Sequence, residues 1–435
     1  VYSCGPTADA RLNIEECRRF VFSDILCRYL EFRGYAVHHI MNITDFDDKT
    51  IQGSEAAGET LSDFTQKYID LFKKDIERLM IKPAEKYPRA SEHIDDMVGL
   101  VKKLIDKGAA YENLRSLYFN IGGFKEYGKL SGIDLNKIKL GATVDLDEYE
   151  KNNPRDFTLM KRARLSELKR GIYVKTEWGN VRPSWHVQCA AMSMKYLGET
   201  YDIHTSSREL VFPHHENEIA IAKAVTGKPL AKFWSHCERV VMENKSADGE
   251  KQMLPTLDEL INEGFTPREI RFWLVSNHYR KPLTFSKTRL LIQTRRSLKR
   301  IDSCIHALIG IKEGTDYPDI DQLVYDIKHG FTSAMDDDLN FPRALVDIFN
   351  IIKKINILIK NNQISSDNAS VLTSAFASVD DVIKIFDFKP KELDPGLHEL
   401  MKKREAARNA GDFEKADQIR EELRTLGVDV QDLKI

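Results

Sequence analysis

The stretch CGPTADARLNIEECRRF, residues 4–20, joins a short apolar segment at residues 1–5 to a long helical pattern. Apolar side chains recur at helical spacing over residues 14–33, and Gly34 follows them as a stop signal. The apolar segment YAVHHIMNI then predicts a second strand at residues 35–43. A strand–helix–strand unit of this size predicts a parallel sheet with a right-handed crossover. A loop placed like residues 4–20 often cradles a nucleotide, so this loop is the first candidate for a functional site.

A second set of elements follows after a mixed region. SWHVQCAAMSMKYLG at 184–198 predicts a helix, TYDIHTSS at 200–207 predicts a strand, and FPHHENEIAIAKAVTG at 212–227 predicts another helix. From about residue 265 onward the pattern is almost wholly helical, and the charged tail at 397–428 predicts a helical hairpin hinged near Gly411. The sequence therefore predicts an α/β fold with a parallel sheet, followed by an all-α C-terminal region.

Length and composition indicate a soluble globular protein of roughly three domains, at about 150 residues each. The chain has 435 residues, of which 42% are hydrophobic and 30% are charged, and its formal net charge is -2. Because there is no global basic bias, nucleic-acid contacts would have to come from local patches. No apolar run of about 18 residues predicts a membrane span, so we expect a cytoplasmic protein without a membrane partner. The six cysteines are scattered, which predicts reduced thiols rather than a disulfide framework.

The motif FPHHENE, residues 212–218, offers candidate metal ligands. His214 and Glu218 are four residues apart, so on a helix they share one face and can both reach one zinc ion. The H-E-x-x-H pattern of zincins is absent, which argues against a metalloprotease. A capped helix with solvated acidic residues is the alternative explanation. A tetrahedral site would need two more ligands, and Cys4 and Cys189 are available, but spacing along the chain alone does not unite them.

These motifs belong to a larger pattern that resembles the cysteinyl-tRNA synthetases, a family of class I aminoacyl-tRNA synthetases. The matching stretches run in family order and cover nearly all of the chain: CGPT at 4–7, NITDFDDKTI at 42–51, PRDFTLMK at 154–161, SWHVQCAAMS at 184–193, FPHHENE at 212–218, HYRKPLTFS at 278–286 and REAARNAGDFEKADQIREELRTLGV at 404–428. The resemblance implies a Rossmann-like class I catalytic domain. It also implies that ATP, with Mg²⁺, activates cysteine as an adenylate and that tRNA then accepts the acyl group.

The resemblance further implies a zinc site that selects the thiol of the substrate. The family's zinc ligands fall here on Cys4, Cys189, His214 and Glu218. A packed pocket separates groups as similar as a thiol and a hydroxyl by only about 1–3 kcal/mol. A zinc ion discriminates better, because it prefers thiolate strongly over hydroxyl. The substrate-binding positions that the resemblance implies are Gly5, Thr7, Trp185 and His215. Trp185 is the position that closes over the bound amino acid, although a plain core tryptophan is the alternative.

The start of the first helix departs from the family's nucleotide signature. The family's H-I-G-H motif falls on residues 13–16, which read NIEE, so both histidines and the glycine are replaced. Asn13 and Glu16 have the spacing of a capping box. Acidic side chains complement the positive end of the helix dipole and occupy the place where an anion would dock. The sequence NIEE therefore predicts a good helix start and a poor triphosphate site.

Two further nucleotide-site elements also depart from the family. The glycine-rich H-G-G-G-x-D turn reads HTSSRE at 204–209, so Cβ atoms hinder close approach to a ribose, while Glu209 can still accept a ribose hydroxyl. The K-M-S-K-S loop falls on SADGE at 246–250, which lacks both lysines, and Lys245 and Lys251 flank it. We therefore expect that the cysteine pocket is preserved and that ATP activation is impaired or done differently.

The resemblance divides the chain into five regions. They are the first half of the catalytic domain at 1–112, a connective insertion at 113–180, the second half with the zinc site at 181–240, a stem-contact region with the K-M-S-K-S position at 241–315, and a helical, anticodon-side tRNA-binding domain at 316–435. Arg404, Arg408 and Arg420 are candidate tRNA contacts, although a solvated helix face explains their mixed-charge surroundings equally well. We expect a monomer.

Three functions fit this pattern. The first is a cysteine–tRNA ligase. The second is a paralogue that ligates cysteine to a different acceptor or uses a preformed activated donor. The third is a non-catalytic protein that binds cysteine or tRNA. Resemblance of fold does not separate them, because function depends on the site.

Overall fold

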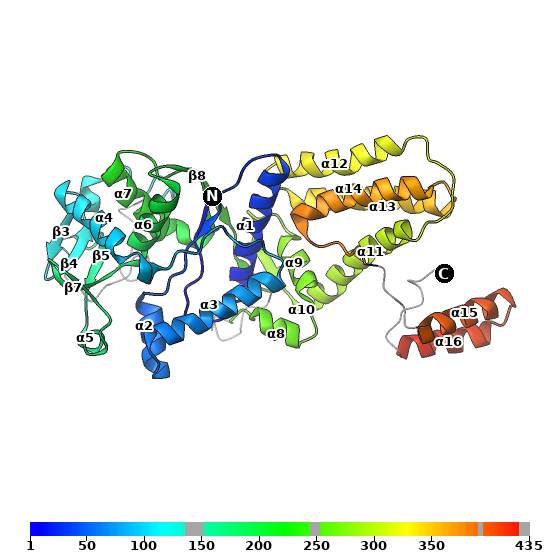
Figure 1. The fold of residues 1–435 in the computed structure, drawn as a ribbon, viewed down its shortest axis with the longest axis horizontal. Coiled ribbons are helices and arrows are strands. Elements are labelled where there is room, and N and C mark those ends of the chain that lie inside the picture. Colours follow the sequence, from blue (N-terminus) through cyan, green and yellow to red (C-terminus); the bar gives the residue numbers. More distant parts are fainter. Residues whose placement is uncertain (135–150, 152, 244–252, 390–394, 426–435) are drawn as a thin grey trace. The chain divides into compact units, whose positions relative to one another are not determined.

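The chain forms two compact units, and the first is built around a parallel sheet. The computed structural model describes residues 1–134, 151, 153–243, 253–389 and 395–425 (Figure 1). The first unit comprises residues 1–294, 332–345 and 381–385. Its main sheet has the strand order β2-β1-β8-β9, and all neighbouring strands are parallel. The strands are β1 (Tyr2–Ser3), β2 (Ile40–Met41), β8 (Tyr201–Ser207) and β9 (Ala231–Cys237). The predicted parallel sheet is therefore confirmed.

The strand predicted at residues 35–43 is much shorter in the structure. β2 keeps only Ile40 and Met41, which pair with β1 on one side and approach residue 86 on the other. The preceding residues, from Tyr35 to His38, are largely exposed and join no strand. Because β2 lies at the edge of the sheet, only its buried residues gain a partner strand, and apolar character alone overstated its length.

The first helix, α1 (Ile14–Phe32), packs against β8, β9 and helix α9 (Pro267–Val275). It begins as the sequence predicts. The side chain of Asn13 accepts hydrogen bonds from the backbone N–H groups of Glu15 and Glu16, at 2.9 and 3.1 Å, and Glu16 accepts one from the backbone of Asn13 at 3.1 Å. This reciprocal pair is a capping box, and it confirms the predicted helix start.

A second, antiparallel sheet forms the insertion. Its strand order is β3-β4-β5-β7-β6. The elements are β3 (Ala110–Asn113), β4 (Ser116–Phe119), β5 (Phe157–Arg162), α5 (Leu165–Arg170), β6 (Val174–Thr176) and β7 (Gly179–Pro183). Its apolar side chains share one core with three helices, α4 (Ile94–Asp106), α6 (Trp185–Leu197) and α7 (Glu216–Thr226). In that core the rings of Phe119 and Phe157 stack at 4.9 Å.

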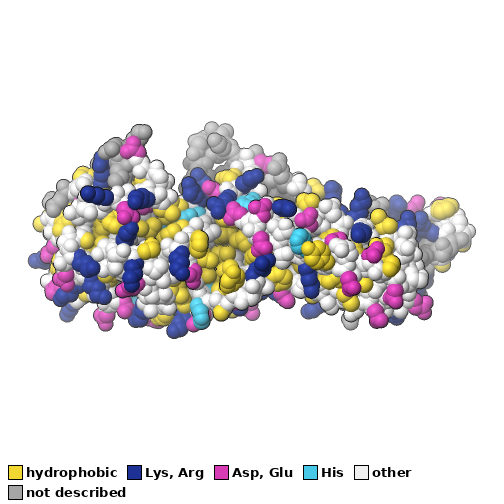
Figure 2. Space-filling view, turned by 90° about the horizontal axis from the view of Figure 1, so that it is seen from above, with side chains coloured by type: hydrophobic (Ala, Val, Ile, Leu, Met, Phe, Trp, Pro, Cys, Tyr) yellow, Lys and Arg dark blue, Asp and Glu magenta, His cyan; other side chains and the backbone are white. Residues whose placement is uncertain are grey.

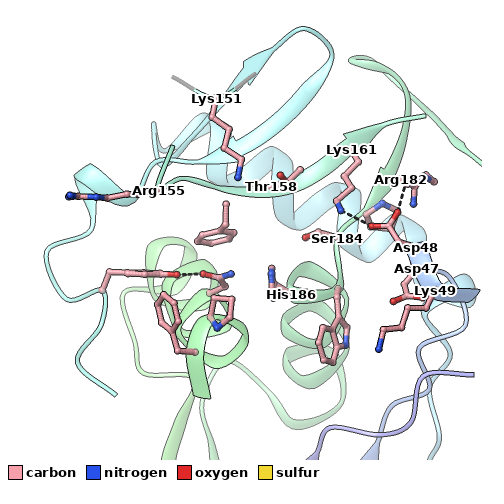
Figure 3. Close-up of a pocket in the computed structure, with 17 residues that line it drawn as sticks. Asp47, Asp48, Lys49, Lys151, Arg155, Thr158, Lys161, Arg182, Ser184 and His186 are labelled. Atoms are coloured by element: carbon pink, nitrogen blue, oxygen red, sulfur yellow. Dashed lines mark hydrogen bonds and ion pairs between the residues drawn. The ribbon is translucent and has the colours of Figure 1, made fainter. Parts of the chain in front are cut away.

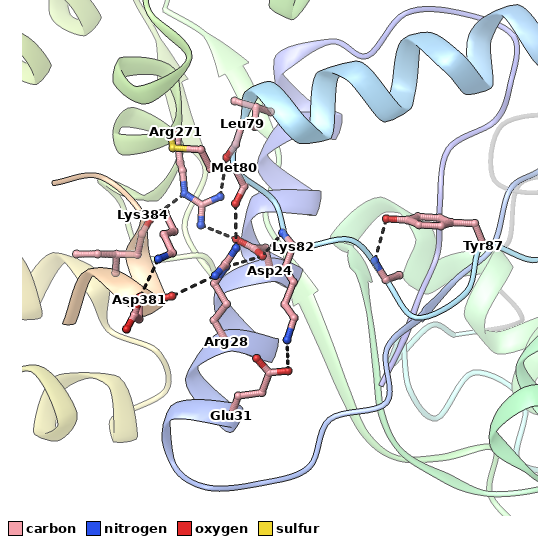
Figure 4. Close-up of polar contacts among 12 residues, drawn as sticks. Asp24, Arg28, Glu31, Leu79, Met80, Lys82, Tyr87, Arg271, Asp381 and Lys384 are labelled. Atoms are coloured by element: carbon pink, nitrogen blue, oxygen red, sulfur yellow. Dashed lines mark hydrogen bonds and ion pairs between the residues drawn. The ribbon is translucent and has the colours of Figure 1, made fainter. Parts of the chain in front are cut away.

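The other elements of this unit surround the sheet. They are α2 (Asp48–Ala57), α3 (Leu61–Arg78), β10 (Val240–Met242), α8 (Leu257–Asn262), β11 (Leu283–Phe285) and α10 (Lys287–Arg289). β10 and β11 pair in parallel. A fully buried ion pair between Asp24 of α1 and Arg271 of α9 joins these two helices (Figure 4). The Arg271 guanidinium also donates to the backbone carbonyls of Leu79 and Ile383.

The second unit is helical, which confirms the predicted all-α C-terminal region. It comprises residues 295–331, 346–380 and 386–435. Its helices, some of which extend into the first unit, are α11 (Arg295–Ile309), α12 (Ile320–Asp336), α13 (Phe341–Lys360), α14 (Ser366–Ile383), α15 (Pro395–Asn409) and α16 (Phe413–Thr425). α15 and α16 pack together as the predicted hairpin, and Gly411 between them has a positive φ of 77°.

The surface carries charges of both signs. On the face shown in Figure 2, Lys and Arg side chains are interspersed with Asp and Glu, as the net charge of -2 leads one to expect. Among the helices that the structure describes, none is both long and apolar enough to cross a membrane.

Candidate functional site

The candidate site lies where β1 and β8 run side by side. Cys4 directly follows β1, and its backbone N–H donates to the carbonyl of Thr205 in β8 at 3.3 Å. Cys189 projects from the middle of α6. His214 lies in the turn before α7, and Glu218 lies in the first turn of that helix. The fold thus brings to one place residues that are up to 214 positions apart in the sequence.

The helix that carries Glu218 begins later than the sequence predicts. α7 begins at Glu216, whereas Pro213 marks the helix start that the sequence predicts. Phe212 has extended backbone angles, with φ −130° and ψ 130°. It precedes Pro213, and the residue before a proline is pushed out of the helical region by the proline ring. His214 and Glu218 nevertheless meet, because the turn from Val211 to His215 delivers His214 to the helix start.

Four side chains converge on one point in this site. Each offers a ligand atom, these atoms lie within 4.8 Å of one another, and all four residues are buried. They are Cys4, His214, His215 and Glu218. Three of them belong to the predicted zinc set, and His215 was predicted as a substrate-binding residue. The fourth predicted ligand, Cys189, lies outside this set of four, although it helps to lower the pKa of Cys4.

Three polar atoms of His214 and Glu218 in this cluster are buried without a hydrogen bond among the described residues. Nε2 of His214 lies 2.6 Å from Oε1 of Glu218, yet the pair lacks hydrogen-bond geometry, and neither oxygen of Glu218 has a hydrogen bond within the described residues. Buried polar atoms are costly when unpaired, so these atoms call for a shared ligand. Sulfur, imidazole nitrogen and carboxylate oxygen are the donors that zinc takes in proteins. The residues therefore fit a zinc ion.

A ring of histidines orients the ligand side chains. Nδ1 of His214 and Nδ1 of His186 lie 2.8 Å apart, and Nδ1 of His215 and Nε2 of His236 lie 3.0 Å apart. Nε2 of His204 lies 3.3 Å from the sulfur of Cys4. Hydrogen bonds of this kind fix the ring orientation and tautomer of metal-binding histidines. Sequence reasoning missed His186, His204 and His236 as members of the site, and His186 could have been noticed only as the neighbour of Trp185.

The two thiols have opposite protonation tendencies. Burial alone would raise the pKa of Cys4, but the Cys189 thiol and His204 outweigh it and hold that pKa well below its ordinary value. Burial, followed by the hydrogen bond with Cys4, raises the pKa of Cys189 well above its ordinary value. The lowered pKa favours the thiolate form of Cys4, and the raised pKa keeps Cys189 as a thiol. A thiolate is the form of cysteine that binds metals.

His214 and Glu218 also favour their charged forms when they lie together. Burial alone would lower the pKa of His214, but the Glu218 carboxylate raises it to about 9. Burial raises the pKa of Glu218, partly offset by His214 and His204. The proton on His214 supplies the positive charge that balances the Glu218 carboxylate. A metal cation bound between them would supply that charge instead.

The predicted substrate-binding residues lie around this cluster. The ring of Trp185 stacks on that of His214 with centroids 4.0 Å apart. Gly5 packs so closely on residue 42 that a Cβ atom would collide with the carbonyl oxygen of Asn42. The backbone N–H of Gly5 donates to the side chain of Asn42 at 3.0 Å. Thr7 forms an isolated parallel bridge with Thr44.

The position of the family's nucleotide signature is acidic in the structure. Burial, followed by the nearby Glu209, raises the pKa of Glu15 to about 7. Oε1 of Glu15 is buried without a hydrogen bond among the described residues, whereas Glu209 is exposed. Lys245, Lys251 and the SADGE segment lie outside the described residues. The described part of the nucleotide position therefore presents carboxylates and helix N–H groups that are already hydrogen-bonded.

Stability should depend on pH through Glu15. Its folded-state pKa of about 7 exceeds the ordinary value of 4.5, so the folded state holds the proton more tightly than the unfolded chain does. Stability therefore falls as the pH rises from 4.5 to about 7. Glu15→Gln should raise the free energy of unfolding at pH 8 by about 1 kcal/mol, after allowance for solvent screening of this part-exposed group. Urea denaturation at pH 8 and at pH 4 measures this gain, and an equal gain at both values would contradict it.

The candidate tRNA contacts lie on the α15–α16 hairpin. Arg408 and Arg420 are exposed, and Arg404 is half-buried. Arg420 forms an ion pair with Asp417 at 3.1 Å on the same helix. The hairpin thus presents exposed cations among acids of its own, as the mixed-charge sequence predicts.

Comparisons with known sequences cover nearly the whole chain. A model described as "tRNA synthetases class I (C) catalytic domain" matches residues 1–295. Models described as "DALR domain" and "Cysteinyl-tRNA ligase anticodon binding domain" match residues 330–387 and 391–434. A cysteine–tRNA ligase of Methanosarcina acetivorans is 41% identical over 444 residues, which are 100% of this chain and 93% of that protein. A cysteine–tRNA ligase of Chlamydia muridarum is 35% identical over 445 residues, with the same coverage.

A solved structure shows the same fold. Methionyl-tRNA synthetase of Mycobacterium tuberculosis, in complex with methionyl-adenylate, superposes with a TM-score of 0.63 at 11% identity. The match covers 88% of this chain and 89% of that chain. The predicted class I catalytic fold and the predicted family are thereby confirmed. From its sequence relatives over its full length, this chain belongs to the cysteinyl-tRNA synthetase family of class I ligases.

Proposed function

We propose that this chain selects cysteine through a zinc–thiolate contact, and that its nucleotide site binds ATP weakly. The observation that carries the proposal is the contrast between two halves of one site. The buried cluster brings three of the four proposed ligands within 4.8 Å of one another, whereas the start of α1 is capped by its own side chains and acidic. Cysteine and tRNA are the substrates that the family's name implies for it.

The proposed zinc ligands are Cys4, Cys189, His214 and Glu218. When bound, the zinc ion would supply a Lewis acid that lowers the pKa of the substrate thiol and holds it as thiolate. Trp185, stacked on His214, would cover the bound amino acid and exclude water. Gly5, Thr7 and His215 are the proposed neighbours of the substrate. The hydroxyl of serine makes a poorer zinc ligand, so selection needs no separate editing site.

The proposed weakness for ATP follows from the helix start. A triphosphate normally uses the free N–H groups and the positive dipole of a helix N-terminus. In α1 the backbone N–H groups of Glu15 and Glu16 already donate to Asn13. The carboxylate of Glu209, and that of Glu15 once it ionises above about pH 7, would face the phosphates with like charge.

Pyrophosphate exchange tests this proposal. We expect the isolated chain to bind cysteine measurably in calorimetry and to show ATP–pyrophosphate exchange at least about 100-fold below that of an intact relative, which corresponds to about 2.7 kcal/mol of lost transition-state stabilisation. Exchange at the rate of an intact relative would refute the ATP part of the proposal. Absence of cysteine binding in a zinc-loaded sample would refute the cysteine part.

A variant that restores the family motif sharpens the test. Changing residues 13–16 from NIEE to HIGH removes the capping box and both acidic groups together. We expect this variant to bind ATP at least about tenfold more tightly than the natural chain, since hydrogen bonds to a charged group contribute about 1.5–3 kcal/mol. Calorimetric titration with ATP measures the change. Unchanged ATP affinity would show that residues 13–16 do not limit nucleotide binding.

The region boundaries and tRNA contacts also remain proposals. We assign the insertion to residues 113–180 and the tRNA-binding helices to residues 316–435, with Arg404, Arg408 and Arg420 facing tRNA. A paralogue with a different acceptor is the second candidate, and the acidic helix start favours it over a standard ligase. Cysteine binding without exchange, together with tRNA binding, would instead support a non-catalytic binder.

A further inference from the structure

A pocket adjoins the ligand cluster, and Trp185 and His186 form part of its wall. It has a volume of about 290 Å³ and is lined by β5, β7, the start of α6 and the residues around the start of α2 (Figure 3). Trp185 belongs to its wall and also stacks on His214. His186 belongs to the same wall, and its Nδ1 lies 2.8 Å from that of His214. A ligand in this pocket would therefore be a direct neighbour of cysteine held at the ligand cluster.

The start of helix α6 opens into this pocket without a cap. Ser184 occupies the N-cap position, yet its side chain accepts no hydrogen bond from the helix. Its hydroxyl is buried and has no hydrogen-bond partner among the residues that the structure describes, and the residue is only 7% exposed. Figure 3 shows Ser184 among the side chains that line the pocket. α6 has 13 residues, and its first N–H groups have no side-chain cap. These N–H groups and the unpaired hydroxyl of Ser184 could all donate to one acceptor, which the described residues do not supply.

A second buried donor belongs to a lining residue of the same pocket. Nδ2 of Asn217, in the first turn of α7, has no hydrogen-bond partner within the described residues, and Asn217 is 1% exposed. Its Oδ1 is engaged by the hydroxyl of Tyr127. Natural proteins rarely leave buried polar groups unpaired, so two such groups in one pocket indicate a bound polar ligand.

The charges around the pocket favour an anion. Lys49, Lys151, Lys161 and Arg182 line it, and Lys151 points into it from above in Figure 3. Arg155 also lines it, but its guanidinium points away from the centre in the same view.

The two acidic residues in the wall are already engaged. Asp47 caps α2 by accepting from the N–H of Thr50 at 3.0 Å. Asp48 forms ion pairs with Lys161 at 2.7 Å and Arg182 at 2.8 Å. Burial alone would raise the pKa of Asp48, but these two cations hold it below its ordinary value. The remaining positive charge and the helix N-terminus attract an oxyanion.

We propose that this pocket binds an oxyanion, a carboxylate or a phosphate, of the acceptor that takes cysteine. The assignment to the acceptor rests on the proposed function, because it requires cysteine at the ligand cluster. The helix start and the hydroxyl of Ser184 hold the anion, Lys151 neutralises it, and Trp185 separates it from the amino acid. The same chemistry can come from a small acid or from a phosphate at the end of an RNA.

Ser184→Asp provides the test, because its carboxylate would cap α6 and fill the place of the ligand. Aspartate is a favoured N-cap residue, so the variant should unfold at or above the temperature of the natural chain. Calorimetry with inorganic phosphate, with succinate and with the trinucleotide CCA compares the sources. We expect the natural chain to bind at least one probe, and Ser184→Asp to weaken its affinity at least about tenfold.

Matched variants complete the design. Lys151→Gln should weaken binding about fivefold, whereas Lys175→Gln, an exposed change on β6 outside the pocket, should leave it unchanged. Binding of succinate alone assigns a carboxylate acceptor, and binding of CCA alone assigns a nucleic-acid phosphate. Failure of all three probes, or affinity that Ser184→Asp does not change, would overturn the proposal. Cysteine affinity, measured separately on each variant, shows whether the proposed function has failed instead.

Discussion

Replacing Cys4 by serine should remove bound zinc from this chain and weaken cysteine binding by about 100-fold or more. Replacing a residue that only supports a metal ligand lowers metal affinity about 10–100-fold. Replacing a direct ligand should therefore lower it by about 100-fold or more. Cys4 lies at the centre of the cluster, with contacts to His204 and His215 at 3.3 and 3.7 Å. Its thiolate character, maintained by Cys189 and His204, is what a serine hydroxyl cannot reproduce.

A pair of further variants identifies the fourth ligand. The converging set contains His215, whereas the family pattern names Cys189. Cys189 lowers the pKa of Cys4 and Cys4 raises that of Cys189, and a zinc ion bound to both sulfurs would displace the proton of Cys189. His215 contacts His236 at 3.0 Å, and burial lowers its pKa well below the ordinary value, so its neutral ring could also bind zinc and only the family pattern favours Cys189. We expect Cys189→Ser to lose zinc and His215→Gln to keep it.

The measurement is the zinc content per chain after dialysis, together with calorimetric titration of cysteine. Cys304→Ser is the control, because this buried cysteine lies on α11 in the second unit. It should keep both zinc and cysteine affinity. Retention of zinc by Cys4→Ser would contradict the whole ligand cluster. Loss of zinc from His215→Gln but not from Cys189→Ser would show that His215, and not Cys189, is the fourth ligand.

Local features of the fold could be predicted because they depend on residues close in the sequence. The capping box at Asn13 and Glu16 needs only three residues of spacing, and it forms as predicted. The length of β2 could not be predicted, because a strand is stabilised by its neighbours, which lie elsewhere in the chain. Pro213 signals a helix start in the sequence, but the regular helix begins only at Glu216, because the residues from Val211 to His215 form an irregular turn first.

The site was predictable only in its outline. Resemblance to a family named Cys4, His214 and Glu218, and the fold places them together. Residue spacing could not show that His186 lies beside His214, because the contact depends on how α6 packs against the turn before α7. The pocket at Ser184 could not be predicted from the sequence either, because a serine directly before a helix normally predicts an N-cap. Only coordinates reveal that its hydroxyl leaves the helix uncapped.

Breaking the buried ion pair between α1 and α9 should have the largest effect on stability. Asp24→Asn is expected to lower the free energy of unfolding by about 3–5 kcal/mol, because it leaves a buried guanidinium without its counter-charge. Both side chains of the pair are fully buried, with Nη2 of Arg271 2.5 Å from Oδ2 of Asp24. Oδ1 of Asp24 also accepts from Arg28 and from the backbone of Lys82, both at 2.8 Å (Figure 4).

A matched control separates burial from charge. Glu31, also on α1, pairs with Lys82 at 2.6 Å, but both side chains are substantially exposed. Glu31→Gln should cost no more than about 1 kcal/mol, as exposed pairs do. Urea denaturation followed by circular dichroism compares the two variants. The double variant Asp24→Leu with Arg271→Met should be more stable than Asp24→Leu alone, because no buried charge is left unpaired. If Asp24→Asn and Glu31→Gln cost the same, the Asp24–Arg271 pair is not what holds these helices together.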